Sequence, residues 1–310
     1  MISFLIKRIL GAIPVVFIII TLSFFMLRLA PSGPFDRERA ISQEKLDALN
    51  AYYSFDKPVY EQYFIYLKNL AKGDFGPSYK YEGWQVTELI VPKAITSLQL
   101  GAFALLIALF FGVLIGITSA KDKDKLSGKF LNELSLMGVC LPSFVVAPIL
   151  ILIFSLKLGW LPAIGWGGIK EAILPAFSLS LFYMAWVAKL TRTQSVEILE
   201  KPYIKTARAK GISNFRVCYI HTLKNASIAL ASYIAPAAAG LMTGSFVIES
   251  IFQISGLGRF FISSALDNDY TMIMACVIIY AVLIIVFNIL SDVILAFLNP
   301  KIAKNLGIKK

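Results

Sequence analysis

The chain has 310 residues, of which 57% are hydrophobic and 16% are charged, and its formal net charge at pH 7 is +11. Its mean hydropathy of +0.72 excludes a soluble globular domain and indicates a polytopic helical membrane protein. Basic loops that face the cytoplasm and anionic lipid account for the charge of such a protein, so nucleic acid is not an expected partner.

The first predicted element is a membrane-spanning helix. Lys7 and Arg8 precede an apolar run at 9–29, which at about 20 residues is long enough to cross the hydrocarbon core. No small-residue cleavage site follows this run, so it differs from a secretory signal peptide. We expect residues 1–29 to form the N-terminus and a retained first transmembrane helix.

Residues 30–96 differ in composition, because they are charged, aromatic and rich in turn-forming residues. They predict an extracytoplasmic insert that is mostly helical. Pro58 is a suitable start for an amphipathic helix that ends near Gly73. The apolar face of this helix would carry Tyr60, Tyr63, Phe64, Leu67 and Leu70.

Five further apolar spans are predicted, and together they form a transmembrane core at 97–300. Pro142 and Pro148 are expected to break the second of these five, because proline removes a backbone donor from a helix. The five spans are expected at 97–120, 131–156, 172–189, 226–248 and 272–298.

The distribution of basic residues predicts the orientation of the six spans. An even number of spans places both termini on the same side of the membrane. The loops at 121–129 and 189–224 are rich in Lys and Arg, whereas the short loops on the opposite side hold only Lys157, Lys170 and Arg259. The positive-inside rule therefore predicts cytoplasmic termini, with a cytoplasmic tail at 301–310.

Residues 201–225, KPYIKTARAKGISNFRVCYIHTLKN, form a basic loop between the fourth and fifth predicted spans. Pro202 suits the first position of a short helix, and Gly211 can close that helix in a left-handed conformation. Ser213 is a plausible N-cap for a second short helix. The loop therefore predicts a helix, a glycine corner and a helix, with small and basic side chains that suit insertion into a groove on a partner. A basic loop held by lipid phosphates is the alternative.

Few ionisable residues lie within the predicted spans. Glu249 and Asp292 lie near span ends, where snorkelling or a local hydrogen bond explains them better than a proton relay. A gradient-driven secondary transporter would also show an acid at the membrane midplane and an internal repeat, and the sequence shows neither.

The residues that carry enzyme chemistry are missing from the sequence. His221 is the single histidine and has no HExxH spacing around it, so zinc hydrolysis is not expected. No GxxxxGK[ST] loop is present to hold ATP phosphates. We expect no catalytic residue and no cofactor bound by this chain, and no disulfide or metal cluster from the three distant cysteines, Cys140, Cys218 and Cys276.

The strings TARAKG and HxLxN in the basic loop resemble the cytoplasmic coupling loop of ABC-importer permeases of the dipeptide and oligopeptide class. RLAP from Arg28 and LPSFVVAP from Leu141 resemble other segments of this class. Two residues depart from the pattern: Pro202 replaces a polar or acidic residue, and Lys224 replaces a proline. The resemblance assigns to the ATPase-coupling loop Tyr203, Lys205, Thr206, Ala207, Arg208, Ala209, Lys210, Gly211, His221, Leu223 and Asn225.

The segment between the fifth and sixth spans, 249–270, is either a turn-rich connector or a functional element. It resembles the closing motif of the class, ExIF followed by PGLG, with Ser255 in place of the proline. Under this resemblance, an extracytoplasmic gate or a contact for a binding protein would be formed by Glu249, Phe252, Gly256 and Gly258.

The resemblance implies an all-α membrane protein with six transmembrane helices and the type I ABC-importer permease architecture, closest to the oligopeptide subgroup. Such a chain is one permease subunit of an ATP-driven oligopeptide importer in the bacterial cytoplasmic (inner) membrane, and it forms half of the translocation pathway. The implied partners are a second homologous permease, ABC ATPase subunits that carry ATP and Mg, an extracytoplasmic peptide-binding protein and the lipid bilayer. Dipeptides or nickel chelates are alternative cargoes within the class.

Overall fold

The computed structural model describes residues 2–29, 55–81, 83–242 and 246–298. Over these residues the regular elements are helices, with one isolated β-bridge between Pro77 and Gln85. The prediction of an all-α protein is therefore confirmed. The expected tail at 301–310 and the first part of the expected insert, 30–54, lie outside the described residues.

Four helices of the described chain are long and apolar enough to cross a membrane. Two further pairs of helices are bent at a short break, by 108° and by 53°, and each pair can count as one broken span. The structure therefore allows four to six spans within the described residues, and the predicted six remain a prediction. The four long helices are α1 (Ile2–Arg28), α4 (Val86–Lys121), α7 (Ile169–Leu199) and α13 (Tyr270–Leu298).

Shorter elements join these helices, and η1 and η2 among them are π-helical. They are α3 (Val59–Leu70), α5 (Leu126–Cys140), α6 (Ser143–Leu150), η1 (Ile151–Lys157), α8 (Pro202–Ala209), α9 (Asn214–Arg216), η2 (Val217–Thr222), α10 (Leu223–Met242), α11 (Phe246–Ile251) and α12 (Leu257–Leu266).

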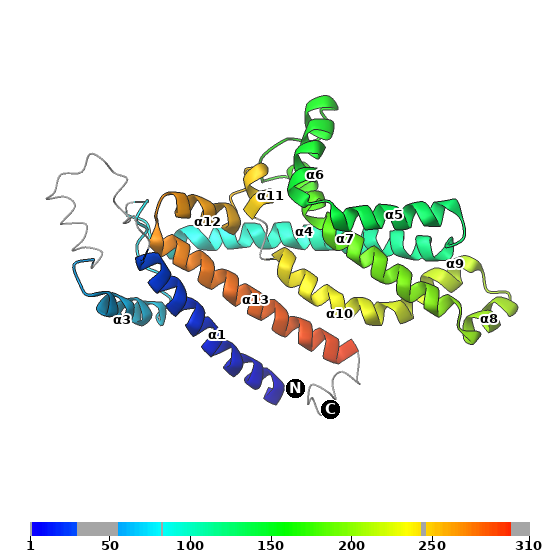
Figure 1. Ribbon diagram of the computed structural model, residues 1–310, viewed down its shortest axis with the longest axis horizontal. Helices are drawn as coiled ribbons and strands as arrows, with labels where there is room; N and C mark the ends of the chain where they lie inside the picture. Colours follow the sequence, from blue (N-terminus) through cyan, green and yellow to red (C-terminus); the bar gives the residue numbers. More distant parts are fainter. Residues whose placement is uncertain (1, 30–54, 82, 243–245, 299–310) are drawn as a thin grey trace.

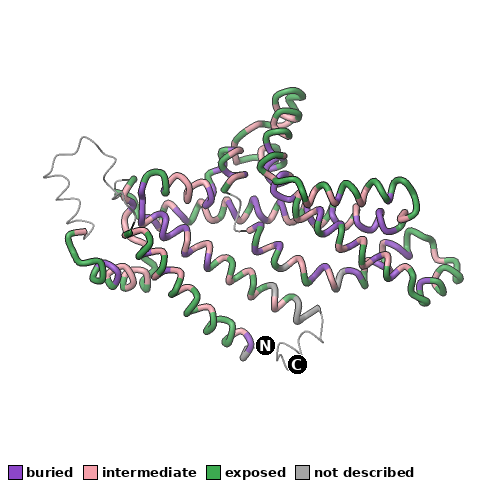
Figure 2. The backbone as a smooth tube through the Cα atoms, viewed as in Figure 1, coloured by how far each residue is buried: buried purple, intermediate pink, exposed green. Residues whose placement is uncertain are grey.

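The helices form an elongated bundle with distinct ends (Figure 1). Helices α3 and α12 lie at one end, and α8 and α9 lie at the other. Helices α4 and α7 pack against each other, and α10 contacts both of them as well as α13. Helix α1 packs on α13 and is mostly exposed, whereas buried positions concentrate on the inner helices (Figure 2).

Glycines on α4 set how closely its neighbours approach. A Cβ atom at Gly112 would lie 2.7 Å from the carbonyl oxygen of Met184, and one at Gly116 would lie 2.5 Å from that of Ala188. Gly101 lies against the backbone of α10 at Leu241 in the same way. Small residues allow this close backbone packing inside a membrane, where van der Waals contact holds helices together. Helix α4 is therefore the centre of the bundle.

The described part of the insert packs beside the ends of α1 and α13 that lie near α12 (Figure 1). Helix α3 begins after Pro58, as expected, and Tyr63 is buried against Phe24 of α1 and Met274 of α13. Of the other residues expected on its apolar face, Leu67 and Leu70 pack on the bundle, whereas Tyr60 and Phe64 are exposed. The hydroxyl groups of Tyr63 and Thr21 are hydrogen bonded at 2.7 Å. The predicted helix is therefore confirmed, but the expectation that Tyr60 and Phe64 lie on its packed face is wrong.

Several element boundaries differ from those expected. Helix α4 begins at Val86 rather than Ser97, and α7 continues to Leu199 rather than ending near Lys189. Both extensions contain polar residues, which lower the hydropathy without ending the helix. The connector expected at 249–270 contains helix α12.

Replacing Gly116 tests the close packing of α4 on α7. We expect Gly116→Ala to lower the melting temperature of the purified protein in detergent, because the added methyl group overlaps the backbone of Ala188 and the side chain of Thr191. Overpacking of this kind costs about 1–3 kcal/mol. Gly11→Ala on α1 is the matched control, since a Cβ atom there meets nothing within 4 Å. Equal melting temperatures for the two variants would contradict this account.

Candidate functional site

The basic loop folds into the predicted helix and glycine corner. Pro202 is the first residue of α8, and Gly211 has the left-handed φ of +78°. The Oγ of Ser213 accepts a hydrogen bond from the N–H of Arg216 at 3.4 Å, so Ser213 is the N-cap that was expected. The helix that follows is longer than predicted, because α9 continues through η2 into α10.

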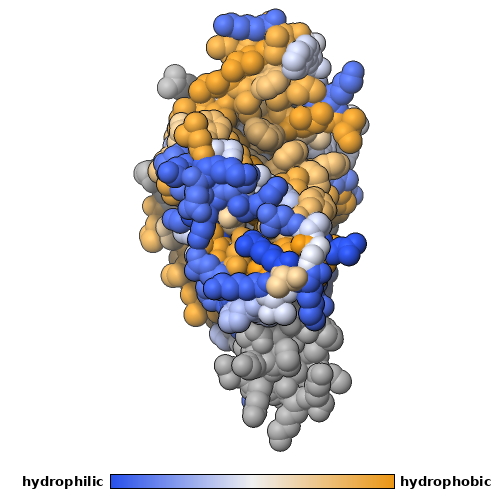
Figure 3. Space-filling view, turned by 90° about the vertical axis from the view of Figure 1, so that its right-hand side faces the viewer, coloured by the Kyte–Doolittle hydropathy of each residue, from blue (hydrophilic) through white to orange (hydrophobic). Residues whose placement is uncertain are grey.

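Helix α8 is held by one buried side chain. Ile204 is fully buried and packs with Ile198 of α7, Val217 of η2 and Ala226 of α10. Ala207 packs beside Ile204, and the remaining side chains of α8 are exposed, so these contacts fix which face points outward. Figure 3 shows a hydrophilic surface over this end of the molecule. We call the exposed residues of α8 and its corner, 203–211, the α8 surface.

The structure brings the two halves of the predicted coupling motif together. The Nδ2 of Asn225 donates hydrogen bonds to the Oη of Tyr203 at 3.0 Å and to the carbonyl oxygen of His221 at 3.1 Å. Tyr203 and Asn225 are both exposed, and they join the start of α8 to α10. Among the other predicted residues, Lys205, Thr206, Arg208, Ala209, Lys210 and Gly211 are exposed, while Ala207, His221 and Leu223 are half-buried.

A neighbouring turn extends this surface, which sequence analysis did not foresee. The Nζ of Lys123, between α4 and α5, lies 2.7 Å from the Oε1 of Glu200 after α7. This hydrogen bond holds the pKa of Glu200 below its usual range and raises that of Lys123. A polar cavity of about 610 Å³ lies between this pair and α8, lined also by Lys121, Lys205 and Arg208. Nothing in the linear sequence joins residues so far apart.

Away from α8, a buried carboxylate organises three helices. Glu249 of α11 has no exposed surface. Its Oε1 accepts a hydrogen bond from the Oγ of Ser97 at 2.6 Å, and its Oε2 accepts from the N–H groups of Gly258 at 2.8 Å and Arg259 at 3.1 Å. The Oγ of Ser97 in turn accepts from the N–H of Leu257 at 2.9 Å. We call Glu249, Ser97 and residues 256–259 the outer hub.

The outer hub satisfies the N-terminus of α12 with one side chain that is near in sequence, Glu249, and one that is distant, Ser97. The first N–H groups of a helix have no partner within it, and the helix dipole favours a negative charge beside them. Burial raises the pKa of Glu249, while the hydrogen bonds from Ser97, Arg259 and Gly258 act in the opposite direction. The expected local hydrogen bond is confirmed, and snorkelling is wrong because the carboxylate is enclosed.

At Gly256 and Gly258 of the outer hub, the structure leaves no room for a Cβ atom. A Cβ atom at Gly256 would lie 2.5 Å from the Oε2 of Glu249, and one at Gly258 would lie 2.5 Å from the Cα of Phe246. A close approach of carboxylate and backbone therefore explains both glycines. Positive φ occurs instead at Gln253, at 54°, which the sequence did not reveal.

Phe252, the remaining residue of the predicted gate or binding-protein contact, lies in a different environment. Phe252 is buried in the apolar core with Leu100, Leu179 and Leu241, and its carbonyl oxygen accepts a hydrogen bond from the N–H of Gly165 at 3.0 Å. Since Glu249 and Phe252 are both buried, neither side chain presents a contact surface to a partner. A role in a gate stays a prediction. Ser97 belongs to the outer hub and was missed, because a serine at the start of an apolar span gives no signal.

Two known families match the chain, one over its N-terminal part and one over most of the remainder. Residues 112–304 match the family described as "Binding-protein-dependent transport system inner membrane component". Residues 1–80 match its N-terminal companion, "Binding-prot-dependent transport system membrane comp, N-term".

Known proteins resemble the chain along nearly its full length. It is 43% identical over 304 residues to the oligopeptide transport system permease protein OppB of Haemophilus influenzae, with 97% of this chain and 99% of that protein covered. OppB of Escherichia coli strain K12 has the same identity and coverage. The dipeptide transport system permease protein DppB of Lactococcus lactis is 37% identical over 302 residues, which cover 97% of this chain and 99% of DppB.

A solved structure has a similar fold. A chain of the MetNI methionine ABC transporter, in an inward-facing conformation, superposes with a TM-score of 0.55 and 18% identity. The superposition covers 68% of this chain and 96% of that one. The likeness concerns the fold alone, and it agrees with the predicted type I ABC-importer permease architecture.

Removing the carboxylate tests the outer hub. We expect Glu249→Ala to lower the melting temperature strongly, because the buried N–H of Gly258, the half-buried N–H of Arg259 and the hydroxyl of Ser97 lose their acceptor. Each unsatisfied buried group costs about 1–3 kcal/mol. Glu249→Gln should cost less, since its amide can accept from the N–H groups and donate to Ser97. Glu197→Ala is the control, because Glu197 is exposed. Identical melting curves for Glu249→Ala and Glu197→Ala would exclude a stabilising hub.

Proposed function

Because the chain belongs to the family of binding-protein-dependent transport system inner membrane components, we propose that it is a permease subunit of an ATP-driven oligopeptide importer. The observation that carries this proposal is the 43% identity to oligopeptide permeases across 97% of the chain. Dipeptide permeases are less similar, at 37% and 34% identity. Dipeptides and nickel chelates remain the alternative cargoes of the class.

The α8 surface is the proposed contact for an ABC ATPase subunit, which would carry ATP and Mg. Its side chains are small or basic and exposed, so it suits a complementary groove with acidic residues. Complementary charge favours rapid and specific association of two proteins. The α8 surface is also firmly attached to the bundle, through Ile204 to α7 and through Tyr203 and Asn225 to α10. Movement of the ATPase would therefore reach both helices.

The remaining partners follow from the geometry of the two ends. We assign the end with α8 to the cytoplasm, together with the start of α1 and the end of α13, because basic residues gather there. The outer hub and α3 would then face the extracytoplasmic side, where a peptide-binding protein delivers cargo. A second homologous permease would supply the other half of the pathway in the inner membrane.

The two acids that a proton relay would use are engaged in structural contacts. Glu249 accepts its hydrogen bonds within the outer hub, and Asp292 of α13 lies 2.7 Å from Arg8 of α1. These contacts favour coupling to ATP over coupling to a proton gradient.

Charge reversal on α8 tests this function. We expect Arg208→Glu combined with Ala209→Glu to abolish peptide uptake and to lower co-purification of the ATPase at least about tenfold, as expected when a central charged contact is reversed. These exposed positions are preferable to Ala207, which packs on the core, and to Gly211, whose φ is positive. Lys72→Glu, on the insert, is the control.

Membrane insertion is measured alongside uptake, so that loss of transport is separated from loss of protein. Normal uptake by the double variant would contradict the proposed coupling role. Uptake that persists without ATP hydrolysis and collapses with a protonophore would replace the importer with a gradient-driven carrier.

A further inference from the structure

The corner between α5 and α6 combines a sharp break with exposed backbone. Helix α5 ends at Cys140 and α6 begins at Ser143, and the two are bent by 108°. Pro142 has no N–H group, so the carbonyl oxygen of Gly138 loses the donor that a continuous helix would supply. Cys140, Leu141 and Pro142 are all exposed. We call residues 140–143 the α5–α6 corner.

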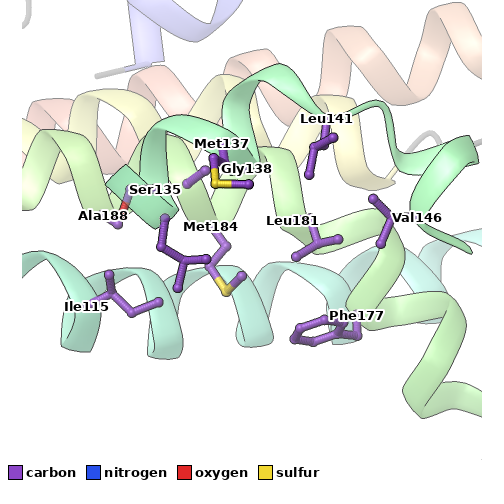
Figure 4. Close-up of a pocket in the computed structure, with 12 residues that line it drawn as sticks. Ile115, Ser135, Met137, Gly138, Leu141, Val146, Phe177, Leu181, Met184 and Ala188 are labelled. Atoms are coloured by element: carbon purple, nitrogen blue, oxygen red, sulfur yellow. The ribbon is translucent and has the colours of Figure 1, made fainter. Parts of the chain in front are cut away.

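This corner lies at the depth of the membrane interior. Helix α5 begins at Leu126, immediately after the basic turn beside α8, and has 15 residues. At 1.5 Å per residue it rises about 22 Å, which is less than the roughly 30 Å of a hydrocarbon core. The corner also faces the middle of α7, at Phe177 and Leu181 (Figure 4).

An interruption of the helix at this depth limits what can surround the exposed backbone groups. Hydrocarbon offers no hydrogen-bond partner, so irregular backbone inside a bilayer occurs only where protein buries it or where it borders a water-filled cavity. In secondary transporters, broken helices place such backbone groups beside the transported solute. The exposed face of the α5–α6 corner therefore does not face lipid.

An apolar pocket lies directly beside the corner (Figure 4). Its volume is about 270 Å³. Leu141 of the corner and Val146 of α6 form one side, and helices α4, α5 and α7 form the remainder. Two methionines, Met137 and Met184, line it, and their flexible side chains adapt to apolar groups of different shape.

We propose that the α5–α6 corner borders the water-filled route of the cargo peptide. The carbonyl oxygen of Pro142 already accepts from the N–H groups of Val145 and Val146. The carbonyl groups of Cys140 and Leu141 accept hydrogen bonds from peptide N–H groups, and the adjacent pocket takes an apolar side chain of the same peptide. Backbone carbonyls bind any peptide, whereas the pocket favours apolar residues, so together they give broad recognition with an apolar preference. This inference rests on the proposed importer function.

The native cysteine at the corner provides the first test. A thiol reacts as its thiolate, which requires water, so a charged methanethiosulfonate reagent reports whether Cys140 faces an aqueous route. We expect Cys140 of the complete importer in proteoliposomes to react, excess cargo peptide to slow the reaction, and the adduct to lower uptake. Mass spectrometry of this chain locates the adduct.

Two controls make the labelling result decisive. Cys218 and Cys276 are buried and should stay unreactive. Ile18→Cys in a Cys140→Ser background places a thiol on the exposed apolar face of α1, where no reaction is expected. If Cys140 reacts only after denaturation while uptake is normal, the proposed route is wrong and the importer function stands. Absence of uptake by the wild-type importer would instead contradict the function itself.

Polar substitution tests the pocket. We expect Met137→Gln and Leu141→Gln to lower uptake of leucine-rich peptides relative to lysine-rich peptides by up to about tenfold, the effect of losing one apolar contact. Leu126→Gln is the matched control, because Leu126 is exposed at the start of α5 and outside the pocket. An unchanged uptake ratio, or an equal loss for both peptides, would overturn the assignment of the pocket.

Discussion

Inside a bilayer, a backbone N–H or C=O group needs a partner within the protein or in a water-filled cavity, because hydrocarbon offers none. This constraint explains why the described chain is built from long helices and why each interruption has a special environment. The N-terminus of α12 is satisfied by the buried carboxylate of Glu249 and the hydroxyl of Ser97. The α5–α6 corner is exposed instead, and it therefore indicates the side of the chain that meets water or another protein. The same rule thus separates a structural interruption from a functional one.

A continuous set of packed elements joins the α8 surface to the outer hub. Ile204 fixes α8 to α7, and the glycines of α4 bring α7 and α4 into direct backbone contact. Helix α4 then continues to Ser97, which hydrogen bonds to Glu249. With 36 residues, α4 is about 54 Å long, so one rigid element passes between the two ends. A displacement at α8 would reach the outer hub through close-packed backbones that cannot deform independently.

Hydropathy and local motifs were sufficient for some features of the chain. The apolar runs located the long helices. Pro202 and Gly211 defined the start and end of α8, and Ser213 defined the cap of α9, because these residues act on their own backbone. Features that depend on distant contacts could not be predicted. Gly256 and Gly258 were expected in a gate or partner contact, whereas the structure shows that they make room for Glu249 and Phe246. The pairing of Lys123 with Glu200, and the 108° angle after Cys140, likewise depend on tertiary packing.

Helix α1 shows how polar contacts can set the position of an otherwise apolar helix. Lipid tails are as apolar as leucine, so burying α1 against α13 brings no hydrophobic gain within the bilayer. Van der Waals packing of Ile20 and Phe24 supplies part of the attraction. Two polar contacts fix the register: Arg8 with Asp292 near one end, and Thr21 with Tyr63 nearer the other. Tyr63 belongs to α3, which packs on Met274 of α13. A slide of α1 along α13 would therefore break both contacts, so they fix the position of α1.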